Sequence, residues 1–304
     1  MSDTFNPMPE VPEELRDAAS SGELVLFIGA GISRLVGLPS WDEFADYVLR
    51  QLVPAGIDYY QLDQIRSIRD PKRKLSIARI IAKNRRLTID YRAQFDRKEG
   101  AISVYSHLNR FKCTFVTTNY DKRISPDCRK SDPESSWRFF RRNDLIRQNL
   151  DVQGNVIHLH GCIDEPNTMI MTDRDYLEHY SQAEVRELLT YMFNKKVVLF
   201  LGYGLDETEI LEYIFRRGSV SANTNQARVR RFILQGFFNA QKALFGVLSS
   251  YYSEVYGTEL IGFPTDYKWY DEQEHILERW AEKLDFGRLA LTDEADLLEE
   301  EVNG

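Results

Sequence analysis

Short, almost continuous apolar runs alternate with amphipathic helical stretches along this chain. Apolar runs of about four to eight residues are typical of strands that are buried on both faces of a sheet. When such strands alternate with helices, the expected architecture is a mostly parallel sheet with helices on both sides. We therefore predict an α/β fold with a doubly wound, Rossmann-like sheet. Its expected strands are residues 24–28, 113–117, 155–159, 196–201, 231–234 and 259–261.

Four of the helical stretches carry apolar residues at the spacing of one helix face. These faces are Trp41, Phe44, Ala45, Val48 and Leu52; Val185, Leu188, Leu189, Met192 and Phe193; Leu244, Val247, Leu248 and Tyr251; and Leu277, Trp280, Ala281 and Leu284. Residues about 42–110 show no convincing strand pattern, so we expect an inserted helical module there. The expected organisation is an N-terminal segment (1–21), a main domain (22–290) and an acidic C-terminal tail (291–304).

Composition excludes several classes of protein. In 304 residues, 43% are hydrophobic and 28% are charged, which is typical of a globular protein and excludes a coiled coil. The three cysteines form no Cys-x-x-Cys pair, so neither a disulfide framework nor a zinc ribbon is expected. A net charge of −8 argues against general nucleic-acid binding. Without a signal-peptide pattern or a membrane-length apolar run, the sequence predicts a cytoplasmic protein.

Charge is distributed unevenly along the chain. Residues 66–98 hold twelve lysines and arginines against three aspartates, whereas residues 271–301 hold twelve acidic residues against three basic ones. Such segments are typical of solvated helix faces and acidic tails. Alternatively, one or both of them could dock another subunit or a partner of opposite potential.

A glycine-containing turn follows the first expected strand, where residues 29–33 read Gly-Ala-Gly-Ile-Ser. Glycines allow a tight turn and a close approach of the backbone to a phosphate, and N–H groups at the start of a helix face the anion. The third glycine of the dinucleotide fingerprint is missing, and no acidic residue stands at the usual ribose position. The turn therefore indicates either a phosphate site or a plain strand-to-helix connection.

Polar residues end two further strands. Asn119 and Asp121 follow the second strand, and His160 follows the third. Because ligands bind beyond the carboxyl ends of strands in a doubly wound sheet, we expect these residues and Gly29 to share one crevice. An oriented amide and a histidine suit binding and general-base work. Each also has a structural interpretation, as an Asx turn or as a core histidine beside His158.

The four motifs taken in order have a family resemblance. The chain resembles the sirtuin-like (Sir2-family) NAD-binding domains of prokaryotic antiphage defence systems over residues 22 to about 285. The motifs are GAGIS at 29–33, TTNYD at 117–121, HLHG at 158–161 and LFLGYG at 199–204.

The resemblance implies roles for individual residues. It places Gly29, Ala30, Gly31 and Ser33 around the phosphates and proximal ribose of NAD, Asn119 at the nicotinamide ribose or a neighbouring water, Asp121 in the same pocket, His160 as the catalytic base, and Gly202 and Tyr203 along the adenosine half. Deacylating sirtuins carry zinc-binding cysteines after the His-Gly strand, but only Cys162 lies nearby here. No zinc is therefore expected.

The resemblance implies an NAD glycohydrolase that cleaves the nicotinamide–ribose bond and depletes cellular NAD in antiphage defence. Two alternatives are an NAD-dependent protein deacylase and a non-catalytic sensor of NAD or ADP-ribose that gates a partner. Relatives of this size suggest a homo-oligomer and a separate HerA-type ATPase partner. We expect no direct contact with nucleic acid or membrane.

Overall fold

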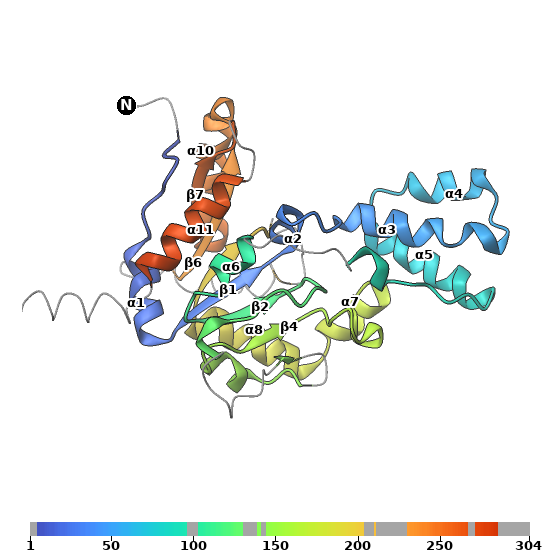
Figure 1. The fold of residues 1–304 in the computed structure, drawn as a ribbon, viewed down its shortest axis with the longest axis horizontal. Coiled ribbons are helices and arrows are strands. Elements are labelled where there is room, and N and C mark those ends of the chain that lie inside the picture. Colours follow the sequence, from blue (N-terminus) through green and yellow to red (C-terminus); the bar gives the residue numbers. More distant parts are fainter. Residues whose placement is uncertain are drawn as a thin grey trace, which may run out of the picture.

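The computed structural model describes residues 5–95, 103–129, 139–140, 144–203, 210, 230–266 and 271–284. Its strands are β1 (Leu24–Ile28), β2 (Thr114–Thr117), β3 (Phe139–Phe140), β4 (Val156–His158), β5 (Val197–Leu201), β6 (Arg231–Phe237) and β7 (Glu259–Pro264). They form one sheet in the order β3-β4-β2-β1-β5-β6-β7 (Figure 1). Every neighbouring pair is parallel. The predicted α/β fold with a Rossmann-like sheet is confirmed.

All six predicted strands are present, with bounds that differ by a few residues. The two-residue strand β3 was not predicted, because two residues are too few to show a period. The expected acidic tail, residues 291–304, lies outside the described residues.

Strand β1 lies at the centre of the sheet, paired with β2 on one side and β5 on the other. All five of its residues are buried. Alternate side chains point to opposite faces of a strand. Accordingly, Leu24, Leu26 and Ile28 belong to one core cluster and Val25 and Phe27 to another. This is why the strand reads as a continuous apolar run.

Helices cover both faces of this sheet. They are α1 (Glu13–Ser21), α2 (Ala30–Leu35), α3 (Trp41–Arg50), α4 (Tyr59–Arg66), α5 (Pro71–Asn84), α6 (Val104–Leu108), α7 (Asp173–Tyr180), α8 (Ala183–Lys195), α10 (Lys242–Tyr256) and α11 (Asp271–Lys283). Short 3₁₀ turns cover Val53–Ala55, Arg92–Gln94, Asp127–Arg129, Arg147–Asp151, Pro166–Thr168 and Asn239–Gln241. Side chains of α1, α6 and α11 pack in one core cluster, and those of α7 and α8 pack in the other. In the part of the chain that is described, no helix is long and apolar enough to cross a membrane.

Helices α3, α4 and α5 lie to one side of the sheet and share a third core cluster (Figure 1). Helix α3 begins at a capping box, in which Ser40 accepts from the Glu43 N–H and the Glu43 carboxylate accepts from the Ser40 N–H. Its buried residues Phe44, Ala45 and Val48 are on the predicted apolar face. Between β1 and β2, the described residues form helices and turns and no strand.

The apolar face predicted for α10 is only partly correct. Leu244, Val247 and Tyr251 are exposed, although the helix itself is present. Leu248 of the predicted face packs on the core, together with Phe245 and Tyr252. Apolar residues occur all around α10, so the spacing alone could not tell which face would be buried.

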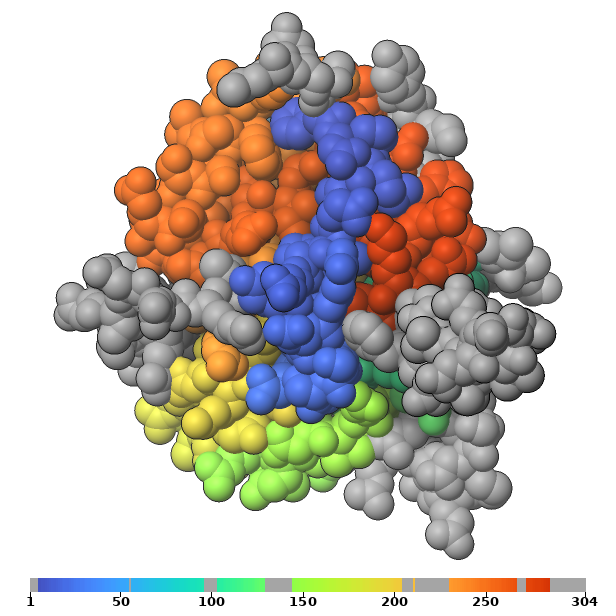
Figure 2. Space-filling view, turned by 90° about the vertical axis from the view of Figure 1, so that its left-hand side faces the viewer, coloured from blue at the N-terminus to red at the C-terminus, as the bar shows by residue number. Residues whose placement is uncertain are grey.

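The N-terminal segment crosses the C-terminal part of the chain. Figure 2 shows it running between the orange and red segments, which are α10 with β7 and α11. The Trp280 indole N–H donates to the Pro9 carbonyl at 2.9 Å, and Phe5 stacks on Phe237. Lys283 pairs with Glu10 at 2.7 Å. These contacts join the two ends of the described chain.

Candidate active site

The direction in which successive strands are added to the sheet reverses between β1 and β5. Strands β2, β4 and β3 lie on one side of β1, and β5, β6 and β7 lie on the other. In open α/β sheets, ligands bind beyond the carboxyl ends of the strands at such a switch point. At this point Gly29 and Gly31 follow β1, and Gly202 and Tyr203 follow β5.

The two glycine turns are in close contact. The Gly29 N–H donates to the Leu201 carbonyl at 2.9 Å, and the Gly31 N–H donates to the Gly202 carbonyl at 2.8 Å. A Cβ on Gly31 would lie 2.7 Å from the Gly202 Cα, and a Cβ on Gly202 would lie 2.4 Å from the Ile32 nitrogen. Gly202 also has a φ of +59°, which favours glycine.

This contact changes the interpretation of the glycines. The sequence suggested that backbone N–H groups of the turn would face a phosphate, but the Gly29 N–H bonds the last residue of β5 and the Gly31 N–H bonds the turn after it. The glycines are therefore required for the close approach of two loops. Any further hydrogen-bond donors for a ligand must come from other residues of the site.

A cavity of about 600 Å³ opens at the switch point. It is bordered by the ends of β1, β5 and β6, by α2 and α3, and by α11. Its lining includes the predicted residues Ala30, Gly31, Gly202 and Tyr203, and also Arg34, Ser40, Trp41, Asp42, Gln235 and Gln273. Its volume lies in the range of small-molecule and cofactor sites.

A smaller cavity of about 30 Å³ adjoins the first. The two share Ala30, Ser40 and Trp41 in their walls. The smaller one is lined by the predicted residues Ser33, Asn119 and Asp121, together with Phe44, Phe95 and Tyr120. The structure thus brings the motifs after β1, β2 and β5 together around two adjoining cavities.

Asn119 is held firmly in the wall of the smaller cavity. Its side-chain amide donates to the Gly29 carbonyl at 3.0 Å, and its backbone N–H donates to the Thr117 hydroxyl at 3.0 Å. The His158 Nδ1 lies 3.2 Å from the Asn119 carbonyl oxygen. His158 therefore supports the backbone beside this cavity. The side-chain oxygen of Asn119 keeps its capacity to accept a hydrogen bond.

Asp121 and Ser33 form a second polar group in the same wall. The Ser33 hydroxyl donates to the Asp121 carboxylate at 2.8 Å, and the Tyr105 hydroxyl donates to the same oxygen at 3.3 Å. Burial raises the pKa of Asp121, while these hydrogen bonds and the charge of Arg123 act in the opposite direction. Ser33 is thus a bonding partner of Asp121, a contact that the sequence did not predict.

His160 lies behind the cavities, and its side chain lines neither of them. It is fully buried, with Nε2 2.7 Å from the Tyr180 hydroxyl and Nδ1 3.5 Å from the Tyr176 hydroxyl. Burial lowers the pKa of His160 well below its ordinary value, with contributions from the charges of His179 and Lys72. The imidazole is therefore neutral at physiological pH.

Two aromatic rings lie between His160 and the cavities. Trp41 lines both cavities, and its ring centre lies 6.5 Å from that of Tyr176. The Tyr176 ring lies 5.0 Å from the His160 ring in an edge-on arrangement. The imidazole is thus connected to the cavity wall through Tyr176 and Trp41.

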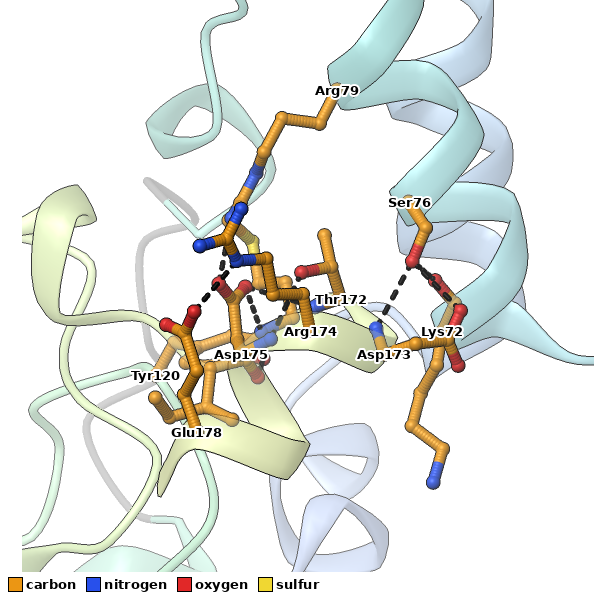
Figure 3. Close-up of polar contacts among 11 residues, drawn as sticks. Lys72, Ser76, Arg79, Tyr120, Thr172, Asp173, Arg174, Asp175 and Glu178 are labelled. Atoms are coloured by element: carbon orange, nitrogen blue, oxygen red, sulfur yellow. Dashed lines mark hydrogen bonds and ion pairs between the residues drawn. The ribbon is translucent and has the colours of Figure 1, made fainter. Parts of the chain in front are cut away.

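Helix α7, which carries the tyrosines around His160, is bound to α5 (Figure 3). Arg79 on α5 pairs with Asp175 at 2.8 Å, and the Asp173 N–H donates to the Ser76 hydroxyl at 3.0 Å. Lys72 lies over the Tyr176 ring, 4.4 Å from its centre. The helices between β1 and β2 therefore contact the surroundings of His160 directly.

Several of these residues were not predicted from sequence. Tyr176, His179 and Tyr180 lie on one face of α7 at a spacing of three and four residues, a pattern that also describes an ordinary core face. Arg34 and Gln273 stand in the cavity wall without any recognisable motif. Contacts between distant segments, which sequence alone does not show, bring these residues to the site.

The described residues contain no group of three or more histidine, cysteine or acidic side chains that could hold a metal ion. Cys113 and Cys162 are buried. Cys162 lies in the core of the helical segment.

A family model of the SIR2-like domain matches residues 113–255. The match supports a Sir2-family domain. It runs from the start of β2 almost to the end of α10, and so includes Asn119, Asp121, His160, Gly202 and Tyr203. SIR2-like domains are typically NAD-utilising enzymes, so the match indicates NAD-related activity and NAD binding. No curated protein matches this chain.

Proposed function

We propose that this protein is an NAD glycohydrolase. The observation that carries the proposal is the pair of adjoining cavities at the switch point of the sheet, with Asn119 and Asp121 in the smaller and Gly202 and Tyr203 in the larger. The smaller cavity has about the volume of one water molecule, so its aromatic rings must move before the nicotinamide ribose of a dinucleotide can lie beside Asn119. The adenosine half would occupy the larger cavity.

The reaction breaks the bond between the nicotinamide nitrogen and C1′ of the ribose, and a water oxygen forms a bond to C1′. One proton leaves the water, so NAD and water give nicotinamide, ADP-ribose and a proton. The nicotinamide of NAD is already cationic and needs no protonation to leave. The main task of the site is to orient the ribose and the water and to stabilise the developing oxocarbenium charge.

In this reaction Asn119 accepts a hydrogen bond from the water or the ribose through its side-chain oxygen. The carboxylate of Asp121 favours the positive charge that develops on the ribose. We propose His160 as the base that takes the proton, which requires the rings of Trp41 and Tyr176 to move when the dinucleotide binds. A neutral imidazole is the form that can accept a proton.

Measurement of nicotinamide release from NAD by the purified protein tests this function, with products identified by mass. We expect Asn119→Ala and His160→Ala to lower the rate about 10²- to 10⁴-fold. His275→Ala is the matched control, because this histidine is on the exposed side of α11. If neither Asn119→Ala nor His160→Ala slows release, the catalytic assignment is wrong.

The burial of His160 favours one alternative, a sensor that binds NAD or ADP-ribose without cleaving it and gates a partner. That function predicts binding by calorimetry and no nicotinamide in long incubations. A protein deacylase, in contrast, would release nicotinamide only when an acylated peptide is added.

We also propose a cellular role and an assembly for this activity. Free cleavage of NAD would harm the cell that makes the enzyme, so we propose that it is gated and acts in antiphage defence by depleting NAD. A cytoplasmic homo-oligomer acting with a HerA-type ATPase is the proposed assembly. Co-expression of the protein with such an ATPase, followed by NAD measurement before and after infection, tests this proposal.

A further inference from the structure

Two hydrogen-bond donors face the larger cavity from different elements. Arg34 belongs to α2, and its side chain is exposed and has no ion pair or hydrogen bond among the described residues. Gln273 belongs to α11 and is only 4% exposed. Its Nε2 is buried without a hydrogen-bond partner in the described part of the chain.

An unpaired buried amide is unusual, since buried polar groups almost always have partners. The unpaired state costs free energy unless a ligand completes the hydrogen bond. The amide nitrogen can only donate, so the missing partner is an acceptor. Because Gln273 stands in the cavity wall, a ligand in that cavity can supply this acceptor.

The backbone N–H groups of Gly29 and Gly31 are not available to bind an anion in this cavity. The N–H groups of Gly29 and Gly31 donate to the carbonyls of Leu201 and Gly202, at 2.9 and 2.8 Å. Arg34 lines the same cavity and carries a positive charge with several donors arranged in a planar fork, which suits a phosphate. The acidic residue in the wall, Asp42, lies 3.1 Å from Lys74, which also pairs with Asp46 at 3.3 Å, so its negative charge is only partly offset.

We infer that Arg34 and Gln273 bind the adenosine diphosphate half of the dinucleotide. Arg34 contacts the phosphates, and the Gln273 amide donates to an acceptor atom of the adenosine. The inference rests on the proposed function, because it assumes that the nicotinamide half lies beside Asn119. It assigns the phosphate contact to a side chain on α2 rather than to the glycine backbone.

Calorimetric binding of ADP and of adenosine to the purified full chain tests the inference without any turnover. We expect the wild type to bind ADP more tightly than adenosine. Arg34→Ala should weaken ADP binding about 10-fold or more and leave adenosine binding almost unchanged, as loss of a charge-assisted hydrogen bond predicts. Arg34→Lys should restore part of the loss, since it keeps the charge but not the fork.

Gln273→Leu should weaken the binding of both ligands by about 5- to 10-fold, because it removes one hydrogen bond to the adenosine. If this variant does not fold, as judged by circular dichroism, the binding of ADP and adenosine is measured with Gln273→Glu instead. It keeps the size and shape but replaces the donor with a negative charge, so it should weaken ADP binding more than adenosine binding.

Arg50→Ala is the matched control for charge. Arg50 lines a neighbouring cavity of about 500 Å³ together with Arg34, but it does not line the larger cavity. Its loss should leave ADP binding unchanged. The inference is overturned if Arg34→Ala binds ADP like the wild type, if Arg50→Ala weakens ADP binding equally, or if the wild type binds neither ligand.

Nicotinamide release, measured on the same protein preparations, separates this inference from the proposed function. If the wild type releases nicotinamide and Arg34→Ala binds ADP like the wild type, this inference is overturned and the glycohydrolase stands. A wild type that binds ADP through Arg34 but releases no nicotinamide refutes the glycohydrolase and supports the binding site.

Discussion

The side-chain amide of Asn119 donates a hydrogen bond to the backbone carbonyl of Gly29 at 3.0 Å. This bond joins the carboxyl ends of β2 and β1, two strands that are neighbours in the sheet. It also fixes the orientation of the amide in the wall of the smaller cavity. One residue thus supports the sheet edge and presents a polar group to the candidate site.

An Asn119→Asp variant tests both roles. A carboxylate cannot donate to the Gly29 carbonyl, so we expect the free energy of unfolding to fall by about 1–3 kcal/mol. Nicotinamide release should fall about 100-fold or more, as expected for a group that orients the reacting water. Urea unfolding and a nicotinamide assay measure the two effects.

Asn149→Asp is the control for that variant. Asn149 makes a similar bond, from its amide to the Asp144 carbonyl at 3.0 Å, and it lines neither cavity. It should lose stability without losing activity. An equal loss of nicotinamide release in both variants would contradict the assignment of Asn119.

Gly202→Ala should destabilise the protein strongly. Its φ of +59° disfavours any side chain, and a Cβ would lie 2.4 Å from the Ile32 nitrogen. We expect a loss of about 1–3 kcal/mol or more in the free energy of unfolding. Gly246→Ala is the control, because its Cβ would meet nothing within 4 Å and alanine favours the α10 helix. Thermal unfolding that is equally affected by both changes would contradict this account.

The buried carboxyl of Asp121 makes stability depend on pH. Burial raises its pKa in the folded state above the ordinary value of about 3.9. Between the ordinary and the raised pKa, the folded state binds a proton that the unfolded state has lost. The contribution of Asp121 to the free energy of unfolding therefore falls as pH rises through this window.

Asp121→Asn removes this titration. The free energy of unfolding of the wild type minus that of the variant should decrease as pH rises above the ordinary carboxyl pKa of about 3.9. Urea titrations at several pH values measure this difference. A difference that stays flat or grows with pH would show that the carboxyl does not carry a raised pKa.

The lowered pKa of His160 determines how the rate of nicotinamide release should depend on pH on the acid side. Burial, with the charges of His179 and Lys72, lowers its pKa well below the ordinary value of about 6.5. If His160 takes the proton, nicotinamide release should stay nearly constant as pH falls through 6.5 and should decline only well below it. An acid limb centred near pH 6.5 would contradict this assignment and indicate a base with the ordinary pKa of a histidine.

The pairing of Asp175 with Arg79 should stabilise the position of α7. The Asp175 carboxylate accepts from the N–H groups of Met171 and Thr172 and from the Arg79 guanidinium. We expect Asp175→Ala to lower the free energy of unfolding by about 2 kcal/mol. Arg174→Ala, which removes an exposed pair with Glu178 on the same helix, should cost less than about 0.5 kcal/mol. Equal losses in urea unfolding would contradict a special role for Asp175.

The strands and their parallel arrangement could be predicted from the sequence because they are buried on both faces and read as apolar runs. The meeting of Gly29 and Asn119 was also predicted, since the carboxyl ends of parallel strands share one edge, whereas His160, expected in the same crevice, lines neither cavity. The order of the strands in the sheet, on which this meeting depends, is set by contacts between strands that are far apart in the sequence.

Other features depend on contacts that no local pattern reports. The sequence placed His160 at a strand end but could not show that Tyr176 and Tyr180 would enclose it. It also could not show that the N–H groups of Gly29 and Gly31 would be used by the turn after β5. The exposed face of α10 was predicted as buried because the helix is apolar on more than one side.

The contacts between the two ends of the described chain have a consequence for folding order. The central strand β1 is made early, but its neighbour β5 and the partners of Phe5 and Pro9 come more than a hundred residues later. The native sheet cannot be completed until β7 has been made, and the N-terminal segment cannot reach Trp280 until α11 has been made. Such long-range closure is expected to make folding slow and to leave the early apolar strand dependent on chaperones during synthesis.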